Sequence, residues 1–291
     1  MSERLETFGV RAALALARTL PGSAAPGVGR ALGRAAFAAG VRRRVCMENL
    51  ARVFGTPAEV GAHERLGKRA YEHVGMSVLE FLRLPQEDPA DLRDRFDLQG
   101  EHHIRAALAA GHGAIVASGH FGNWEMMGAC AVAHGWPVTF VVQRLRNSDV
   151  DRIVQGIRTG VGIEVVERGM ALRRVHASLA ANRLVHFMCD QDARRRGVFV
   201  PLFGIPASTP KGAAQLALRA GVPFIPAFGW RLDAQGRHHA EFTPPVVARS
   251  TDEDAAVLEL LTEFNLRLEV AVRRVPEQYW WAHRRWKTRP A

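Results

Sequence analysis

The chain has 291 residues, of which 47% are hydrophobic, so it is long enough to bury a substantial core and is not expected to be disordered. Its formal net charge of +10 favours an anionic partner, and phosphate-bearing lipid, nucleic acid and an acidic carrier protein all qualify. Three widely spaced cysteines without CxxC or Cys/His spacing indicate neither a disulfide framework nor a zinc site, and we expect no metal or cofactor.

The N-terminal part of the chain reads as helical. Helices are expected over residues 5–20, 26–40 and 60–83. Early glutamates and interrupting arginines are atypical of a signal peptide, and no window holds the ~18 uninterrupted apolar residues of a spanning helix. Residues 8–41 are apolar with scattered arginines. That pattern is typical of helices lying in the headgroup region of a membrane, and equally of core helices in a soluble bundle.

From residue 96 onward, short β-branched runs alternate with helical patterns. This alternation predicts an α/β fold with a central mixed, largely parallel sheet flanked by helices. We expect an N-terminal helical, membrane-associating segment over 1–95 and an α/β domain over 96–291. The expected strands are 114–118, 138–142, 163–166, 184–189, 224–228 and 239–243. The expected helices are 101–110, 123–134, 149–159, 170–181, 211–220 and 254–275.

The stretch "ASGHFGNWEMMGA", residues 117–129, has the shape of a strand, a glycine-rich turn and a helix. Ligands gather at the carboxyl ends of strands in such sheets. Asn123 can cap the helix. If that helix began before His120, the spacing would place His120 and Glu125 about 140° apart, but from the turn His120 can fold back toward Glu125.

A histidine held by a carboxylate keeps one tautomer and suits a general base that deprotonates an alcohol. Gly122 allows unusual backbone angles, and the N–H groups near Gly122 and Asn123 at the helix start can face a developing negative charge. The alternative is a capped structural helix with a satisfied histidine.

The block "SGHFGNWE" resembles the H-x4-D/E block of glycerolipid acyltransferases, in the glutamate form of the late acyltransferases of lipid A biosynthesis. Four further blocks carry the same resemblance over nearly the whole chain. They are "RRVCMENLARVFG" (43–55), "VVQRLRNSDVDRIVQGIRTGVGIEVV" (141–166), "FMCDQDARRRGVFVPLFGIPASTPKGAAQLALRAGVPFIP" (187–226) and "YWWAHRRWKTRP" (279–290).

The resemblance implies roles for individual residues. His120 resembles the general base and Glu125 its orienting partner. Arg144 resembles an arginine that binds phosphate or holds the site geometry. Arg146 competes for that role, because the proline that commonly follows the arginine is missing here. Asp190 matches a block that lines the same cleft.

Asp192 belongs to that block as well. On the residues alone, the two aspartates follow an apolar strand and could position Arg144 or another basic residue, while Asp192 could equally start a solvated loop. The segment beside the acyl-donor site in the family matches "GVFVPLFG" and Thr209. Phe199 and Phe203 fit an apolar wall for an acyl chain, or a hydrophobic loop packed on the core. Thr209 before Pro210 also resembles a helix N-cap.

The segment "WWAHRRWKTRP" interleaves tryptophan with basic residues. This pattern suits a membrane interface with anionic headgroups, single-stranded nucleic acid, or a solvated tail. No nucleic-acid motif accompanies it, so a nucleic-acid partner is not expected.

As a whole, the resemblance implies an O-acyltransferase on the cytoplasmic face of the bacterial inner membrane. The donor would be acyl carrier protein or acyl-CoA, and the acceptor an anionic glycolipid similar to a lipid A precursor. Relatives that acylate phosphoinositide mannosides, amino-acid lipids or pigments leave the acceptor open. The alternatives are a thioesterase that uses the same residues on water, and a non-enzymatic basic protein that binds membranes or nucleic acid.

Overall fold

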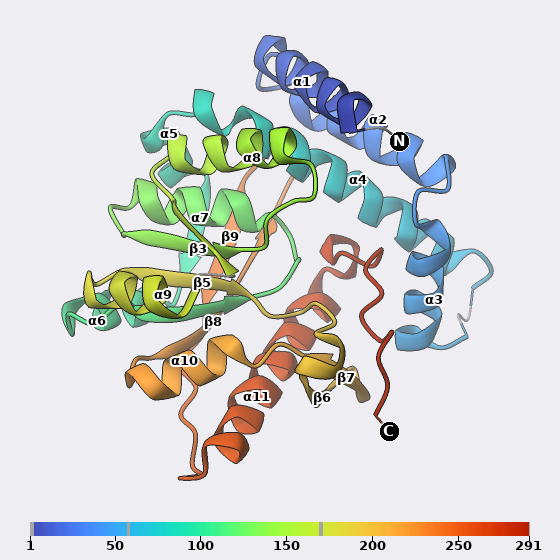
Figure 1. Ribbon diagram of the computed structural model, residues 1–291. Helices are drawn as coiled ribbons and strands as arrows, with labels where there is room; N and C mark the ends of the chain where they lie inside the picture. Colours follow the sequence, from blue (N-terminus) through green and yellow to red (C-terminus); the bar gives the residue numbers. More distant parts are fainter. Residues whose placement is uncertain (1–2, 57–58, 169–170, 291) are drawn as a thin grey trace.

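A seven-stranded sheet forms the centre of the computed structural model, which describes residues 3–56, 59–168 and 171–290 (Figure 1). Its strand order is β1-β9-β8-β2-β5-β3-β4, and β8 with β9 is the antiparallel pair in a sheet whose other neighbours are parallel. The expected mixed, largely parallel sheet is therefore confirmed. The strands are β1 (Phe96–Gln99), β2 (Ala114–Ser118), β3 (Val138–Val142), β4 (Glu164–Glu167), β5 (Leu184–Met188), β8 (Phe224–Arg231) and β9 (His238–Phe242).

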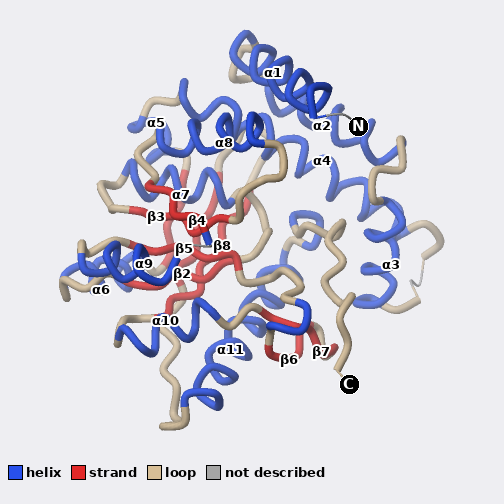
Figure 2. Tube along the Cα trace, in the orientation of Figure 1, coloured by secondary structure: helices blue, strands red, loops and turns tan. Residues whose placement is uncertain are grey.

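Helices cover both faces of this sheet, as Figure 2 shows with the red strands at the centre of the blue helices. Alternate residues of β2 face the two sides. Ile115 and Ala117 join a core with α9 (Ala171–Ala180), α10 (Gly212–Ala220) and α11 (Glu253–Arg274). Ala114 and Val116 join a core with helices from the other side, which are α5 (Pro89–Asp94), α6 (Glu101–Ala109), α7 (Trp124–Ala133) and α8 (Ser148–Gly160). Residue 170, where we expected a helix to begin, lies outside the described residues.

A β-hairpin, β6 (Val198–Leu202) with β7 (Ile205–Thr209), replaces the expected loop and packs on α11. The interpretation of Thr209 as a helix N-cap is wrong, because Thr209 ends β7 and α10 begins after Lys211. Short 3-10 turns complete the order of elements at η1 (Leu84–Gln86), η3 (Arg194–Arg196) and η4 (Pro276–Gln278).

The N-terminal part consists of α1 (Glu3–Thr19), α2 (Ala25–Ala38), α3 (Arg43–Phe54) and α4 (Ala62–Arg83), followed by α5. α2 and α4 cross at glycines. A Cβ atom on Gly33 would lie 2.0 Å from the Tyr71 carbonyl oxygen, and one on Gly75 would lie 2.1 Å from the Gly29 carbonyl oxygen. The two backbones are therefore in direct contact, and α2 fixes the position of α4.

No described helix is long and apolar enough to cross a membrane. The division of the chain at residue 95 and the membrane-associating role of the first helices stay predictions.

Candidate active site

The turn between β2 and α7 requires a glycine at Gly122. Its φ is 58°, in the left-handed region that favours glycine, and an added Cβ would lie 1.8 Å from the Gly229 carbonyl oxygen. The Gly122 N–H donates to the Gln278 carbonyl oxygen at 2.7 Å. We expected this N–H group to face a developing negative charge. The structure corrects that expectation, because the N–H already donates to a backbone carbonyl.

Asn123 caps α7 as the sequence predicts. Its Oδ1 accepts from the Met126 N–H at 3.2 Å, and its Nδ2 donates to Glu80 Oε2 at 2.7 Å. Burial would raise the pKa of Glu80, but His238 and Arg231 outweigh it and lower that pKa to about 2. An ionised carboxylate from α4 thus fixes the residue that starts α7.

His120 and Asp190 form a hydrogen-bonded pair at the edge of the sheet. β2 and β5 are parallel neighbours in which Ser118 lies opposite Met188, so the residues two positions further on meet beyond the strand ends. His120 Nδ1 lies 2.7 Å from Asp190 Oδ1, and the His120 backbone N–H donates to Oδ2 at 2.8 Å. Burial opposes the charge of Asp190, but the electrostatic interaction and hydrogen bonds with His120, together with Arg285, hold the pKa of Asp190 below its usual value.

This pairing leaves the other ring nitrogen of His120 as the reactive atom. An Nδ1–H that donates to an ionised carboxylate makes Nε2 the acceptor of the neutral imidazole. The amide nitrogen of Gln191 lies 3.2 Å from Nε2, the geometry of a donor capping that lone pair. Trp124 packs against the imidazole with 4.9 Å between ring centroids. His120 is therefore held in one orientation with a basic nitrogen at the surface of a pocket.

The structure corrects the expected contact between Glu125 and His120, because the carboxylate at His120 is Asp190. Glu125 lies on the first turn of α7 and faces α8, where Arg158 binds it with two hydrogen bonds, Nε to Oε2 at 3.0 Å and Nη2 to Oε1 at 2.5 Å. Trp124 Nε1 donates to the same carboxylate at 3.1 Å. Glu125 is thus half of a buried ion pair beside the histidine.

A pocket of about 130 Å³ brings His120 and Glu125 together. One wall is the face of α4, one is the histidine turn, and the third comes from the segment after α11. The lining residues are His73, Val74, Ser77, Val78, Phe81, His120, Gly122, Asn123, Trp124, Glu125, Gln278 and Trp280. An apolar wall opposite a basic nitrogen suits a ligand with a hydrocarbon part next to its reacting atom.

The two arginines that we expected to bind substrate, Arg144 and Arg146, lie outside the pocket. Arg144 is 66% exposed at its side chain and pairs with Asp151 at 3.8 Å. Arg146 is 97% exposed and lies 3.9 Å from Glu3. Neither belongs to the pocket lining. Both follow β3, which β5 separates from the histidine strand, and this places them beside α1 and α8.

Three more of the expected residues, Asp192, Phe203 and Phe199, also lie outside the pocket lining. Asp192 accepts from the Thr288 hydroxyl at 3.0 Å and is not part of the pocket lining. Phe203 packs in the core, with its ring centroid 6.1 Å from that of Trp281. Of the two interpretations of Phe203, the structure supports packing on the core. Phe199 is 36% exposed on β6, and it also lies outside the pocket lining.

Thr209 is fully buried and accepts from Arg285 Nη2 at 2.6 Å. Arg285 itself is 1% exposed, and Trp281 and Trp286 are buried with it. The aromatic and basic segment is therefore largely part of the core, which corrects the reading of its tryptophans as an interface belt.

Sequence reasoning missed Arg158 and the pocket wall on α4. Arg158 stands in a block that marks the resemblance, but an arginine in an amphipathic helix of an arginine-rich chain carries no local signal of its partner. The α4 residues His73, Val74 and Phe81 repeat at helical spacing, which is equally typical of an ordinary core face.

Comparison with known proteins gives several matches. The family model of the bacterial lipid A biosynthesis acyltransferases matches residues 2–288. The phosphatidylinositol mannoside acyltransferase of Mycobacterium tuberculosis is 32% identical over 222 residues, covering 74% of this chain and 69% of that protein. The lipid A biosynthesis lauroyltransferase of Escherichia coli is 28% identical over 254 residues, covering 86% of this chain and 80% of that protein. The solved 1-acyl-sn-glycerophosphate acyltransferase of Thermotoga maritima aligns with a TM-score of 0.38 and 17% identity, covering 85% and 95% of the two chains.

The α/β fold, the oriented histidine and the named relatives together define an acyltransferase. The family model covers almost the whole sequence, so the chain belongs to the bacterial lipid A biosynthesis acyltransferase family. The family predicted from the sequence blocks is thereby confirmed.

Proposed function

We propose that the protein is a membrane-associated O-acyltransferase that moves a fatty acyl chain from a thioester donor to a hydroxyl of a glycolipid. The observation that carries the proposal is the His120–Asp190 pair, which holds Nδ1 at 2.7 Å and leaves Nε2 at a pocket with an apolar wall. A neutral imidazole in this setting is suited to remove a proton from an alcohol.

In the proposed reaction, His120 Nε2 takes the hydroxyl proton while the acceptor oxygen attacks the carbonyl carbon of the thioester. The tetrahedral intermediate then collapses, the C–S bond breaks, and the leaving thiolate takes the proton back from the imidazolium. Asp190 stabilises the imidazolium between these steps without taking up its proton. No serine or cysteine is acylated, so both substrates occupy the site together.

The start of α7 supplies groups for the developing oxyanion. The N–H groups of Trp124 and Glu125 open the helix, have no intrahelical acceptor, and belong to residues that line the pocket. Arg158 neutralises Glu125 beside them, so the carboxylate does not oppose a negative charge at the helix start. In this arrangement Glu125 and Arg158 keep the helix start in place, and Asp190 orients the base.

For the acceptor we propose a lipid A precursor-like glycolipid. A phosphoinositide mannoside is the second candidate, and the 32% identity to the mycobacterial enzyme favours it. Both are anionic and carry sugar hydroxyls, which suits a chain of net charge +10. The donor is proposed to be acyl carrier protein or acyl-CoA.

Peripheral attachment to the cytoplasmic face of the bacterial inner membrane is proposed for the first helices. Large apolar side chains are exposed on them, including Phe8 at 70%, Leu5 at 56% and Leu32 at 48%. α1 also carries Arg4 and Arg11 on its surface. Exposed apolar groups next to arginines suit a helix that lies in the interface of an anionic bilayer.

The test is transfer of a radiolabelled acyl group from acyl carrier protein or from coenzyme A, assayed separately, to a bacterial lipid extract. The His120→Ala variant should lose transfer, and replacement of the exposed His112 by alanine should leave it unchanged. Mass spectrometry of the labelled lipid identifies the acceptor. Transfer by His120→Ala near the wild-type rate would overturn the proposal, and hydrolysis of the donor without a lipid product would identify a thioesterase.

A further inference from the structure

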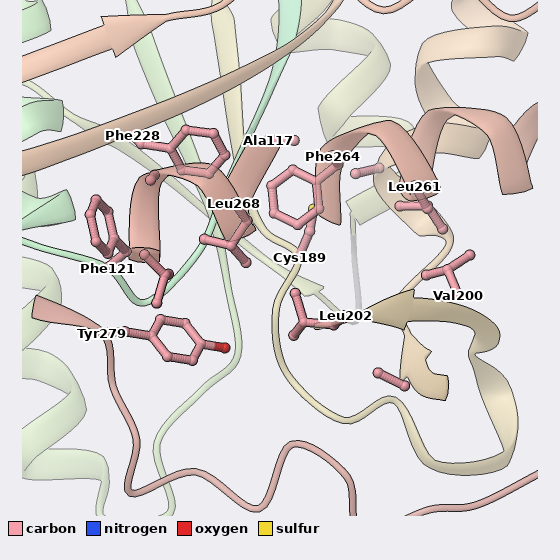
Figure 3. Packing of buried hydrophobic residues seen from close by; sticks show 14 of the residues in the cluster. Ala117, Phe121, Cys189, Val200, Leu202, Phe228, Leu261, Phe264, Leu268 and Tyr279 are labelled. Carbon is pink, nitrogen blue, oxygen red and sulfur yellow. The ribbon is translucent and has the colours of Figure 1, made fainter. Parts of the chain in front are cut away.

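Two walls of the pocket, the histidine turn and the segment after α11, are joined to each other. The Trp280 N–H donates to the His120 carbonyl oxygen at 2.9 Å. Next to this contact, Phe121 of the turn and Tyr279 of the segment form an antiparallel bridge, and their rings belong to one cluster of buried side chains (Figure 3). These two walls are therefore held in place before any ligand binds, and α4 supplies the third.

The face of α4 that lines the pocket has a polar side and an apolar side. His73 and Ser77 lie about 40° apart around the helix axis. On the same scale Val74, Val78 and Phe81 lie about 80–140° from His73. Val78 is 49% exposed, so the apolar side is the one nearer to solvent. A ligand in the pocket meets polar groups along one side of α4 and hydrocarbon along the other.

Most polar side chains of the lining already have partners in the protein. The Ser77 hydroxyl donates to the Gly122 carbonyl oxygen at 3.4 Å. Gln278 Nε2 donates to the Arg231 carbonyl oxygen and its Oε1 accepts from the Arg231 N–H, both at 2.8 Å. The other bonded lining residues, with the partners given above, are His120, Asn123, Trp124 and Glu125.

His73 differs from these residues. In the part of the chain that the structure describes, its half-buried imidazole forms no hydrogen bond or ion pair. The Trp280 indole also has no acceptor there, but an indole can only donate. Burial, followed by the positive charges of Arg231 and Arg30, lowers the pKa of His73 to about 4. At neutral pH the ring is therefore uncharged, with one nitrogen that donates and one that accepts.

A group that both donates and accepts matches a hydroxyl, which does the same. An ionised phosphate oxygen only accepts, and a cation holds it better. A sugar lipid carries several hydroxyls close together, so one of them can bind His73 while another reaches His120 Nε2. Hydrocarbon offers no such group and suits the apolar side of α4.

We infer that His73 is a binding residue for the acceptor, whose imidazole holds a second sugar hydroxyl of the lipid that His120 deprotonates. The inference rests on the proposed function, because it takes His120 as the base and a sugar hydroxyl as the acceptor. His73 then selects lipids with neighbouring hydroxyls, because a lipid with one isolated hydroxyl lacks the second contact.

The test measures transfer of a labelled palmitoyl group from palmitoyl-CoA to two purified sugar lipids, phosphatidylinositol dimannoside and a tetraacylated glucosamine disaccharide. KM is determined separately for the donor and for the sugar lipid that accepts more label. His73→Leu removes both ring nitrogens, while His73→Gln keeps one donor and one acceptor. His63→Leu is the matched control, because His63 is a half-buried histidine of the same helix that lies outside the pocket lining.

We expect KM for the sugar lipid to rise roughly 5- to 30-fold in His73→Leu with KM for the donor unchanged, as for the loss of hydrogen bonds between neutral groups. His73→Gln should recover most of this loss, and His63→Leu should match wild type. An unchanged KM for the sugar lipid in His73→Leu would overturn the inference. An equal rise in both KM values would overturn it as well, because that result indicates a general change in the pocket wall.

A second measurement covers a His73→Leu protein that does not fold. In the His120→Ala variant, the 15N NMR signals of the His73 ring are followed as the sugar lipid is added in zwitterionic detergent micelles, with the signals assigned from His73→Gln. We expect these signals to move with the sugar lipid and to stay in place with micelles alone. No movement, or an equal movement with micelles alone, would overturn the inference. Full transfer activity of His120→Ala would instead overturn the proposed function, which keeps the two failures distinct.

Discussion

At the crossing of α2 and α4, replacing a glycine by alanine is predicted to destabilise the protein. Gly33→Ala places a methyl group 2.0 Å from the backbone carbonyl oxygen of Tyr71. Ordinary contacts between such atoms are about 3.5 Å, so the helices must separate by roughly 1 Å or more. A carbonyl in a helix cannot rotate aside as a flexible side chain would.

The magnitude comes from two opposing effects. Overpacking a tight contact typically costs about 1–3 kcal/mol, while alanine in a helix interior gains up to about 1 kcal/mol over glycine. Because the clash is with backbone, we expect the upper part of the first range and a net loss of about 1–2 kcal/mol. For a chain of this size, that loss corresponds to a fall in Tm of roughly 2–3 °C.

The assay is thermal unfolding followed by circular dichroism, repeated as urea unfolding. Gly27→Ala is the matched control, because Gly27 lies in the same helix and an added Cβ there meets nothing within 4 Å. Gly27→Ala should leave Tm unchanged or raise it. If Gly33→Ala proves as stable as Gly27→Ala, the close crossing of the two helices is refuted.

Three further predictions concern the site. Asp190→Asn should lower kcat by about 10²- to 10⁴-fold, because the imidazole loses the carboxylate that fixes its tautomer, and Asp192→Asn should stay close to wild type in the same transfer assay. Equal rates in these two variants would contradict the assignment of the orienting carboxylate. Arg158→Met leaves the Glu125 carboxylate buried without its cation and should cost about 3–5 kcal/mol in urea unfolding, part of which a second change, Glu125→Gln, should restore. Burial, then the charge of Arg231, lowers the pKa of His73 to about 4. His73 takes up a proton near pH 6.5 in the unfolded chain and near pH 4 in the folded chain. The contribution of neutral His73 to the free energy of unfolding is therefore fully present above pH 6.5 and is lost as the pH falls between these values. Between pH 7 and 5 the His73→Gln variant should lose about 2 kcal/mol less than wild type, and parallel stability curves would reject this account.

The strands that sequence reasoning located best are those buried on both faces. β2 and β3 have the predicted bounds, because β2 lies between Gly113 and Gly119, and β3 starts after Pro137 and ends where polar residues replace the apolar run. The β6–β7 hairpin was missed for a physical reason. Its turn has positive φ at Phe203 and Gly204, as a type I′ turn requires, but phenylalanine is an unusual residue there and conceals the signal. α3 was missed because Arg42 precedes it without any side-chain cap.

The parts of the site that depend on residues adjacent in the sequence were predictable. The strand, the glycine turn with His120 in it and the Asn123 cap all follow from a few adjacent residues. The partner of His120 does not, because it depends on β2 lying beside β5 in a register that places Ser118 opposite Met188. No spacing within one block contains that information, and a nearby glutamate is the natural but incorrect inference.

The contact between Trp280 and His120 has a consequence for how the protein becomes active. It closes a loop that includes most of the sheet, and closing such a loop costs conformational entropy before its own contacts repay any of it. We therefore expect the turn to be clamped only after the strands have paired. During refolding, the far-UV circular dichroism of a complete sheet should be present well before the first molecule of product forms.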